Sequence, residues 1–73
     1  AGMNESPQLK YKEALKYVPN MTAKEWQRAW QAMTDAGNTK VAQRTALQRL
    51  GYTSQQAYDI VEVRRMKLAD LKG

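Results

Sequence analysis

Cysteine, histidine and phenylalanine are all absent from this 73-residue chain. The lack of cysteine excludes disulfides, thiolate metal ligands and thiol nucleophiles, and the lack of histidine removes the commonest general base. Most zinc sites and most catalytic residue sets are therefore excluded, and the seven carboxylates are too scattered for a calcium loop. We expect a protein that is not an enzyme and that binds no cofactor or metal.

Long apolar runs are absent as well. No run approaches the roughly 20 residues of a membrane span, and the polar N-terminal stretch lacks the apolar core of a signal peptide. We therefore expect a cytoplasmic protein without membrane contact, too small to spare interior space for a small-molecule substrate. Ala1 and Gly2 before Met3 resemble an expression scar, so we divide the chain into a disordered start, residues 1–5, and one helical domain, residues 6–73.

Positive charge is concentrated in the second half of the chain. Residues 1–38 carry five Lys or Arg against four acidic residues, net +1, whereas residues 39–73 carry seven against three, net +4. Such asymmetry favours a polyanionic partner, because contacts with phosphates release counterions. A solvated, lysine-rich helical surface explains the same composition equally well.

Capping and breaking residues predict the first two helices. Ser6–Pro7 is typical of a helix start, and apolar residues then recur at helical spacing to about Val18. Thr22 with Glu25 three positions later forms a capping box for the second helix, which ends at Gly37.

Two more helices follow. Thr39 caps a third, roughly Lys40 to Leu50, which stops at Gly51. The fourth begins after Thr53 or Ser54 and is expected to run almost to Leu71, projecting from the body beyond Val63. The predicted core residues are Leu15, Val18, Trp26, Trp30, Met33, Ala46, Leu50, Ile60 and Val61. On the third helix the inward side is predicted to include Val41, Ala42 and Leu47 as well.

A faint internal duplication relates the two halves. The stretch ALKYVPNMTAKEW, Ala14–Trp26, parallels ALQRLGYTSQQA, Ala46–Ala57, with one residue fewer in the second copy. Each copy reads as helix, corner, capping box and helix, the second box being Thr53 with Gln56. We therefore predict an all-α fold, a small orthogonal bundle of four helices built as two stacked helical hairpins.

The corner at Gly51 resembles the helix-turn-helix family of DNA-binding modules, over residues 43–62. The positions that this pattern fills with apolar or small residues hold Leu50, Tyr52, Ala57 and Ile60. Leu47 departs from the pattern, because the family usually has alanine or glycine four residues before the turn glycine. The resemblance implies that the helix after Thr53 is a recognition helix whose start enters the major groove of duplex DNA.

Polar and cationic residues near this corner are the candidate contacts. The base-reading candidates are Ser54, Gln55, Tyr58 and Asp59; glutamine can pair with N6 and N7 of adenine, and aspartate can accept from the cytosine amine. The phosphate-contact candidates are Lys40, Arg44, Arg49, Arg64 and Arg65. Short recognition sites also favour either a homodimer or neighbouring domains, and Leu68 and Leu71 are the candidate contacts for a homodimer.

The competing interpretation is a protein-interaction or structural module, such as a helical domain of a phage virion, mobile-element or regulatory protein. An apolar groove between short helices would then receive a partner helix. The contact candidates in that case are Trp30, Met33, Tyr52 and Tyr58.

Overall fold

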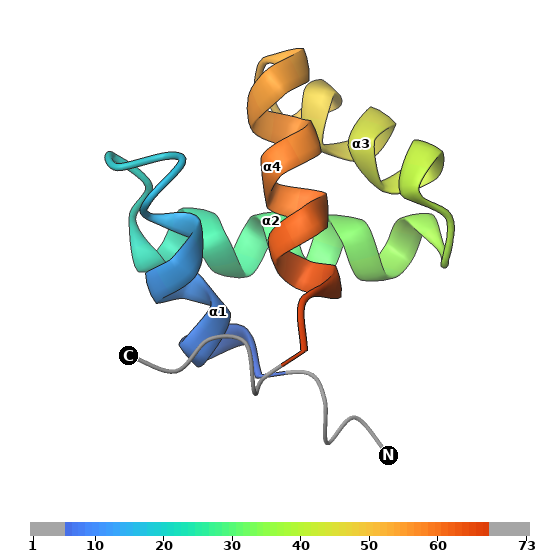
Figure 1. Ribbon diagram of the computed structural model, residues 1–73. Coiled ribbons are helices and arrows are strands. Elements are labelled where there is room, and N and C mark those ends of the chain that lie inside the picture. Colours follow the sequence, from blue (N-terminus) through green and yellow to red (C-terminus); the bar gives the residue numbers. More distant parts are fainter. Residues whose placement is uncertain (1–5, 68–73) are drawn as a thin grey trace.

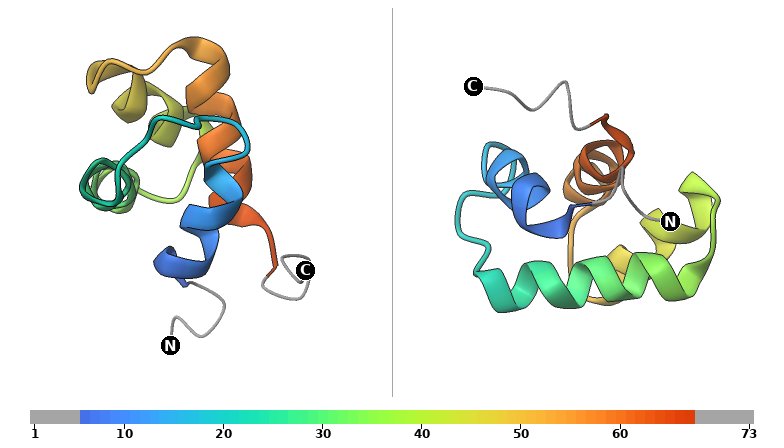
Figure 2. Two further views of the ribbon diagram at one scale, coloured as in Figure 1. Left: turned by 90° about the vertical axis from the view of Figure 1, so that its left-hand side faces the viewer. Right: turned by 90° about the horizontal axis from the view of Figure 1, so that it is seen from below.

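The computed structural model describes residues 6–67, which form four helices and no strand (Figure 1). They are α1 (Pro7–Ala14), α2 (Ala23–Ala36), α3 (Lys40–Arg49) and α4 (Ser54–Arg65). Contacts join α1 to α2, α2 to α3, α3 to α4 and α4 back to α1, so the helices form a closed ring. In the right-hand view of Figure 2, α2 lies lengthwise while α4 is seen nearly end-on. The predicted orthogonal four-helix bundle is confirmed.

Both predicted capping boxes fix helix starts. The Thr22 hydroxyl accepts from the Glu25 amide at 3.1 Å, and the Glu25 carboxylate accepts from the Thr22 amide at 2.8 Å. At the start of α4, Thr53 and Gln56 make the same reciprocal pair at 3.1 and 3.0 Å. Each pair satisfies two amides that the first helical turn leaves without partners.

The C-terminal ends of the helices differ more from the prediction than their N-terminal starts do. Beyond Ala14 the chain tightens into a turn in which the Tyr17 amide donates to the Ala14 carbonyl, so α1 stops four residues before Val18. Ser6 holds the N-cap position of α1, but its hydroxyl makes no capping hydrogen bond. The α4 helix ends at Arg65, because Met66 is extended, so the prediction of a longer helix is wrong. Residues 1–5, Leu68 and Leu71 lie outside the described residues.

The core lies where the four helices meet. Five of the predicted core residues are buried, namely Val18, Trp26, Met33, Ile60 and Val61, and Leu15 and Trp30 are partly buried against them. Further buried side chains that the core prediction did not include are Ala14, Met21, Ala29, Ala57 and Val63. Within the described residues, no helix has the length and apolar character needed to cross a membrane.

One helix, α3, turns the predicted side to the core only in part. On α3, Leu50 is 41% exposed and Val41 is 64% exposed, so both inward assignments are wrong, and Ala46 is only partly buried. Leu47 is buried as predicted, and Gln43, one turn before it, is buried although the prediction did not include it. The Gln43 side-chain N–H donates to the Gly37 carbonyl at 2.8 Å, which supplies this buried donor with a partner from the preceding loop.

Candidate nucleic-acid interface

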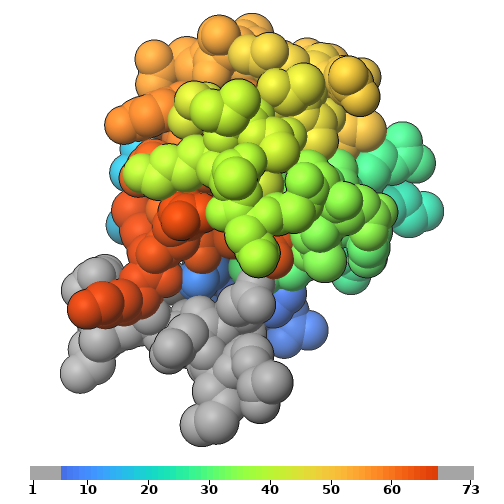
Figure 3. Space-filling model, turned by 90° about the vertical axis from the view of Figure 1, so that its right-hand side faces the viewer, coloured from blue at the N-terminus to red at the C-terminus, as the bar shows by residue number. Residues whose placement is uncertain are grey.

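One side of α3 and α4 carries a continuous row of polar side chains, here called the α3–α4 face. Its members are Lys40, Arg44 and Gln48 of α3 and Ser54, Gln55, Tyr58, Asp59 and Glu62 of α4. The three α3 residues are spaced four apart, which places them on one side of the helix. Figure 3 looks toward this part of the molecule, where the start of α3 lies beside the second half of α4.

The start of α4 is open to solvent on this face. Ser54 and Gln55 are exposed, and Tyr58 is 49% exposed. Together with Arg44 and Gln48 they line a shallow hollow of about 400 Å³ between α3 and α4. The structure therefore brings three of the base-reading candidates together with one of the phosphate-contact candidates.

Side-chain hydrogen bonds hold the polar groups of this hollow. The Gln48 side-chain amide donates to the Ser54 hydroxyl at 3.0 Å, which links the end of α3 to the start of α4. The Gln55 amide donates to the Asp59 carboxylate at 3.1 Å, within α4. Gln48 is absent from the sequence-based candidates, although its spacing of four residues from Arg44 placed it on the same helix side.

At the far end of the face, Lys40 forms an ion pair and Arg65 forms a hydrogen bond. The Lys40 ammonium lies 3.3 Å from the Glu62 carboxylate, and both side chains are partly exposed. Arg65, exposed at the end of α4, donates to the Asn38 carbonyl at 3.4 Å. Lys40, Arg44 and Arg65 therefore all lie along the side where α3 meets α4.

The other two phosphate-contact candidates lie elsewhere. Arg49 is exposed and lines a separate hollow between α2 and α3, beside Asp35 and Ala46. Arg64 lies against α2, with its guanidinium carbon 4.2 Å from the centroid of the Trp30 ring. The predicted group of five cationic side chains is thus split over three places.

Arg64 helps to anchor the end of α4. Its guanidinium donates to the Trp30 carbonyl at 3.1 Å and to the Thr34 hydroxyl at 3.0 Å. From the other side Lys10, which is only 1% exposed, donates to the Arg64 carbonyl at 2.5 Å. The prediction that α4 projects from the body beyond Val63 is therefore wrong. The burial of Lys10 could not be predicted from the sequence, because the carbonyl that accepts its hydrogen bond is 54 positions away.

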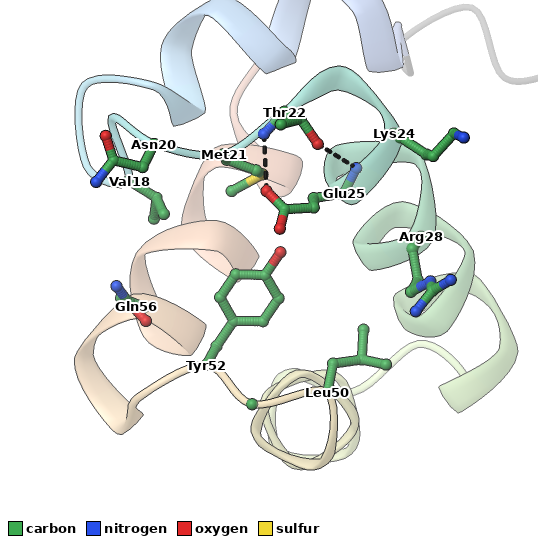
Figure 4. A pocket seen from close by; sticks show the side chains of 11 residues that line it. Val18, Asn20, Met21, Thr22, Lys24, Glu25, Arg28, Leu50, Tyr52 and Gln56 are labelled. Atoms are coloured by element: carbon green, nitrogen blue, oxygen red, sulfur yellow. Dashed lines mark hydrogen bonds between the residues drawn. The ribbon is translucent and has the colours of Figure 1, made fainter.

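A second hollow, of about 470 Å³, lies where the α3–α4 turn meets the start of α2. Figure 4 shows the Tyr52 ring pointing across it, with the hydroxyl directed toward Glu25. Burial raises the pKa of Tyr52 above its usual value of about 10, the Glu25 carboxylate raises it further, and Arg28 lowers it. Tyr52 is therefore a protonated hydrogen-bond donor at neutral pH.

No cluster of metal ligands accompanies these hollows. Within residues 6–67, no group of three or more acidic side chains lies close enough together to hold a metal ion, and the sequence has no histidine or cysteine to add. Comparison with known protein families, with curated proteins and with solved structures gives no match to this chain.

Proposed function

We propose that the chain binds duplex DNA through the α3–α4 face, with α4 as the helix that enters the major groove. The observation that carries this proposal is the shared hollow in which exposed Ser54, Gln55 and Tyr58 lie beside Arg44. Side-chain amides and hydroxyls suit base edges, and a neighbouring guanidinium suits the phosphate backbone.

The charges of the face set the expected strength of binding. Lys40, Arg44 and Arg65 lie on this side, but Asp59 and Glu62 lie among them and oppose the approach of phosphates. About three phosphate contacts predict that log K falls with log salt concentration with a slope of about −2.7. Binding of mixed duplex DNA, followed by fluorescence anisotropy from low to moderate salt, tests this prediction directly.

Two arginines of α3 provide a matched pair of variants. Arg44→Ala removes a cation from the α3–α4 face, whereas Arg49→Ala removes one from the hollow between α2 and α3. Arg44→Ala is expected to weaken binding to all sequences and to reduce the salt slope by roughly 1. Arg49→Ala is expected to change binding much less. Equal losses in the two variants, or the absence of salt-sensitive binding to duplex DNA, would overturn the proposal.

A protein partner is the second candidate, and one hollow favours it. Pro7, Tyr11, Trp26 and Trp30 line a depression of about 480 Å³ between α1 and α2, with the Tyr11 and Trp26 rings stacked at 6.4 Å. Aromatic-lined grooves of this kind accept apolar peptide segments. Of the earlier contact candidates, Met33 is fully buried and is not available to a partner. Gln27 is exposed and also lines this depression. In this function Gln27→Glu, which sets a charge beside the apolar segment, is expected to weaken the protein complex, and Arg44→Ala is expected to leave it unchanged.

A further inference from the structure

The exposed side of α4 holds a glutamine and an aspartate one helical turn apart, and the two are joined. Gln55 is exposed and Asp59 is half-buried. The Gln55 side-chain amide donates one hydrogen bond to the Asp59 carboxylate at 3.1 Å. The carboxylate is therefore occupied by its neighbour and is poorly placed to accept from a base.

This bond changes what Gln55 can offer to a ligand. A glutamine side chain has two N–H donors and one carbonyl acceptor, and Asp59 takes one of the donors. One N–H and the carbonyl oxygen remain. In the major groove adenine presents N7 as an acceptor and N6 as a donor, so the remaining pair matches adenine. Guanine presents two acceptors, N7 and O6, and a glutamine with one remaining N–H matches that edge poorly.

One neighbouring group, the Ser54 hydroxyl, is held in the same way. The Ser54 hydroxyl accepts from the Gln48 amide at 3.0 Å, and Arg44 lines the same hollow. A polar group held before binding loses less conformational freedom when it meets a base, so its donor–acceptor pattern discriminates better between bases. Gln55 thus lies in a preorganised polar surface.

We infer that Asp59 is a positioning residue, which orients Gln55 so that the α3–α4 face prefers an A·T pair over a G·C pair at one position of the duplex. This inference rests on the proposed DNA binding and names the base pair that the same face selects. It also replaces the sequence-based role of Asp59 as an acceptor for the cytosine amine.

The protein contains a matched control for this pair. On α2, the Gln31 side-chain amide donates to the Asp35 carboxylate at 2.9 Å, with the same spacing of four residues, and both residues are exposed. Asp35→Ala therefore removes the same charge and the same kind of hydrogen bond at a place away from the α3–α4 face. Any effect of net charge on DNA affinity appears in both aspartate variants.

The experiment selects preferred duplexes from a randomised pool with the whole chain and then measures affinities for single base-pair changes. Adenine is expected to be preferred over guanine at one position by about 5- to 100-fold, and Gln55→Ala should abolish that preference. Asp59→Ala should reduce it to below about 3-fold, whereas Asp59→Asn, which keeps an acceptor oxygen, and Asp35→Ala should retain it.

Two results separate the failure of this inference from the failure of the proposed function. If the chain binds duplex DNA with the expected salt dependence, but Asp59→Ala keeps the full adenine preference or no preference exists, only the role of Asp59 is overturned. If the chain shows no salt-sensitive binding to duplex DNA, DNA binding itself is overturned, and the role of Asp59 with it. Circular dichroism of each variant establishes that the helices are intact.

Discussion

The two ends of α4 use similar polar and charged residues in opposite ways. At the C-terminal end, Arg64 lies on the Trp30 ring and its carbonyl accepts from buried Lys10, so the charged groups hold helices together. At the N-terminal end, Ser54 and Gln55 are exposed and form hydrogen bonds with neighbouring polar side chains. The difference teaches that a polar or charged side chain in a small domain has a structural or a surface role according to what the fold places beside it.

The largest effect is expected from removing the anchor at the C-terminal end. Arg64→Ala loses a cation–π contact and two hydrogen bonds and should lower the free energy of unfolding by about 2 kcal/mol. Arg65→Ala, at the next residue, should cost less than about 0.5 kcal/mol, because Arg65 is exposed and its hydrogen bond is 3.4 Å long. Urea unfolding followed by tryptophan fluorescence measures both variants. Similar losses in the two would show that the anchor is not specific to Arg64.

A smaller effect is expected at the N-terminal end. Thr53→Ala removes the hydroxyl that accepts from the Gln56 amide and should cost about 1 kcal/mol of stability. Amide hydrogen exchange should accelerate in the first turn of α4 before it does so elsewhere. Thr45→Ala, at an exposed position within α3, provides the control and should be neutral or stabilising by up to about 0.5 kcal/mol. If Gln56 exchanges at the same rate in both variants, the capping box does not stabilise this end.

The smallest effect concerns pH and the turn that leads into α4. Because burial and Glu25 raise the pKa of Tyr52, the native state holds the phenolic proton more tightly than the unfolded state does. The resulting contribution to stability is complete below about pH 10 and is lost as pH rises through the raised pKa. Tyr52→Phe should therefore lose less stability than the wild type between about pH 9 and pH 11. Tyr17→Phe, at an exposed tyrosine, serves as the control, and parallel pH profiles for all three proteins would contradict the prediction.

Helix starts could be predicted from sequence because their determinants are local. Each capping box lies within four consecutive residues, and its two hydrogen bonds join residues three positions apart. The all-α fold follows from these starts together with the apolar spacing and the corner glycines, which have φ of 108° and 110°.

The roles of individual polar residues could not be predicted because they depend on distant partners. The carbonyl that accepts from Lys10 belongs to Arg64, and the carbonyl that accepts from Arg64 belongs to Trp30. The rotation of α3 was missed for a related reason. The alanines of α3 do not define a strongly apolar side of the helix. The burial of Gln43 instead depends on a hydrogen bond to the Gly37 carbonyl of the preceding loop, which the sequence of α3 does not contain.

The closed ring of helix contacts means that no helix of this bundle is peripheral. Although α1 is the shortest, the Pro7 carbonyl accepts from the Trp26 indole at 2.6 Å, and Lys10 reaches the last turn of α4. Loss of α1 would therefore uncover two helices at once and leave a buried indole N–H and a helix-end carbonyl without their partners. The eight residues of α1 therefore complete the ring of helix contacts, and the stability of the whole bundle depends on them.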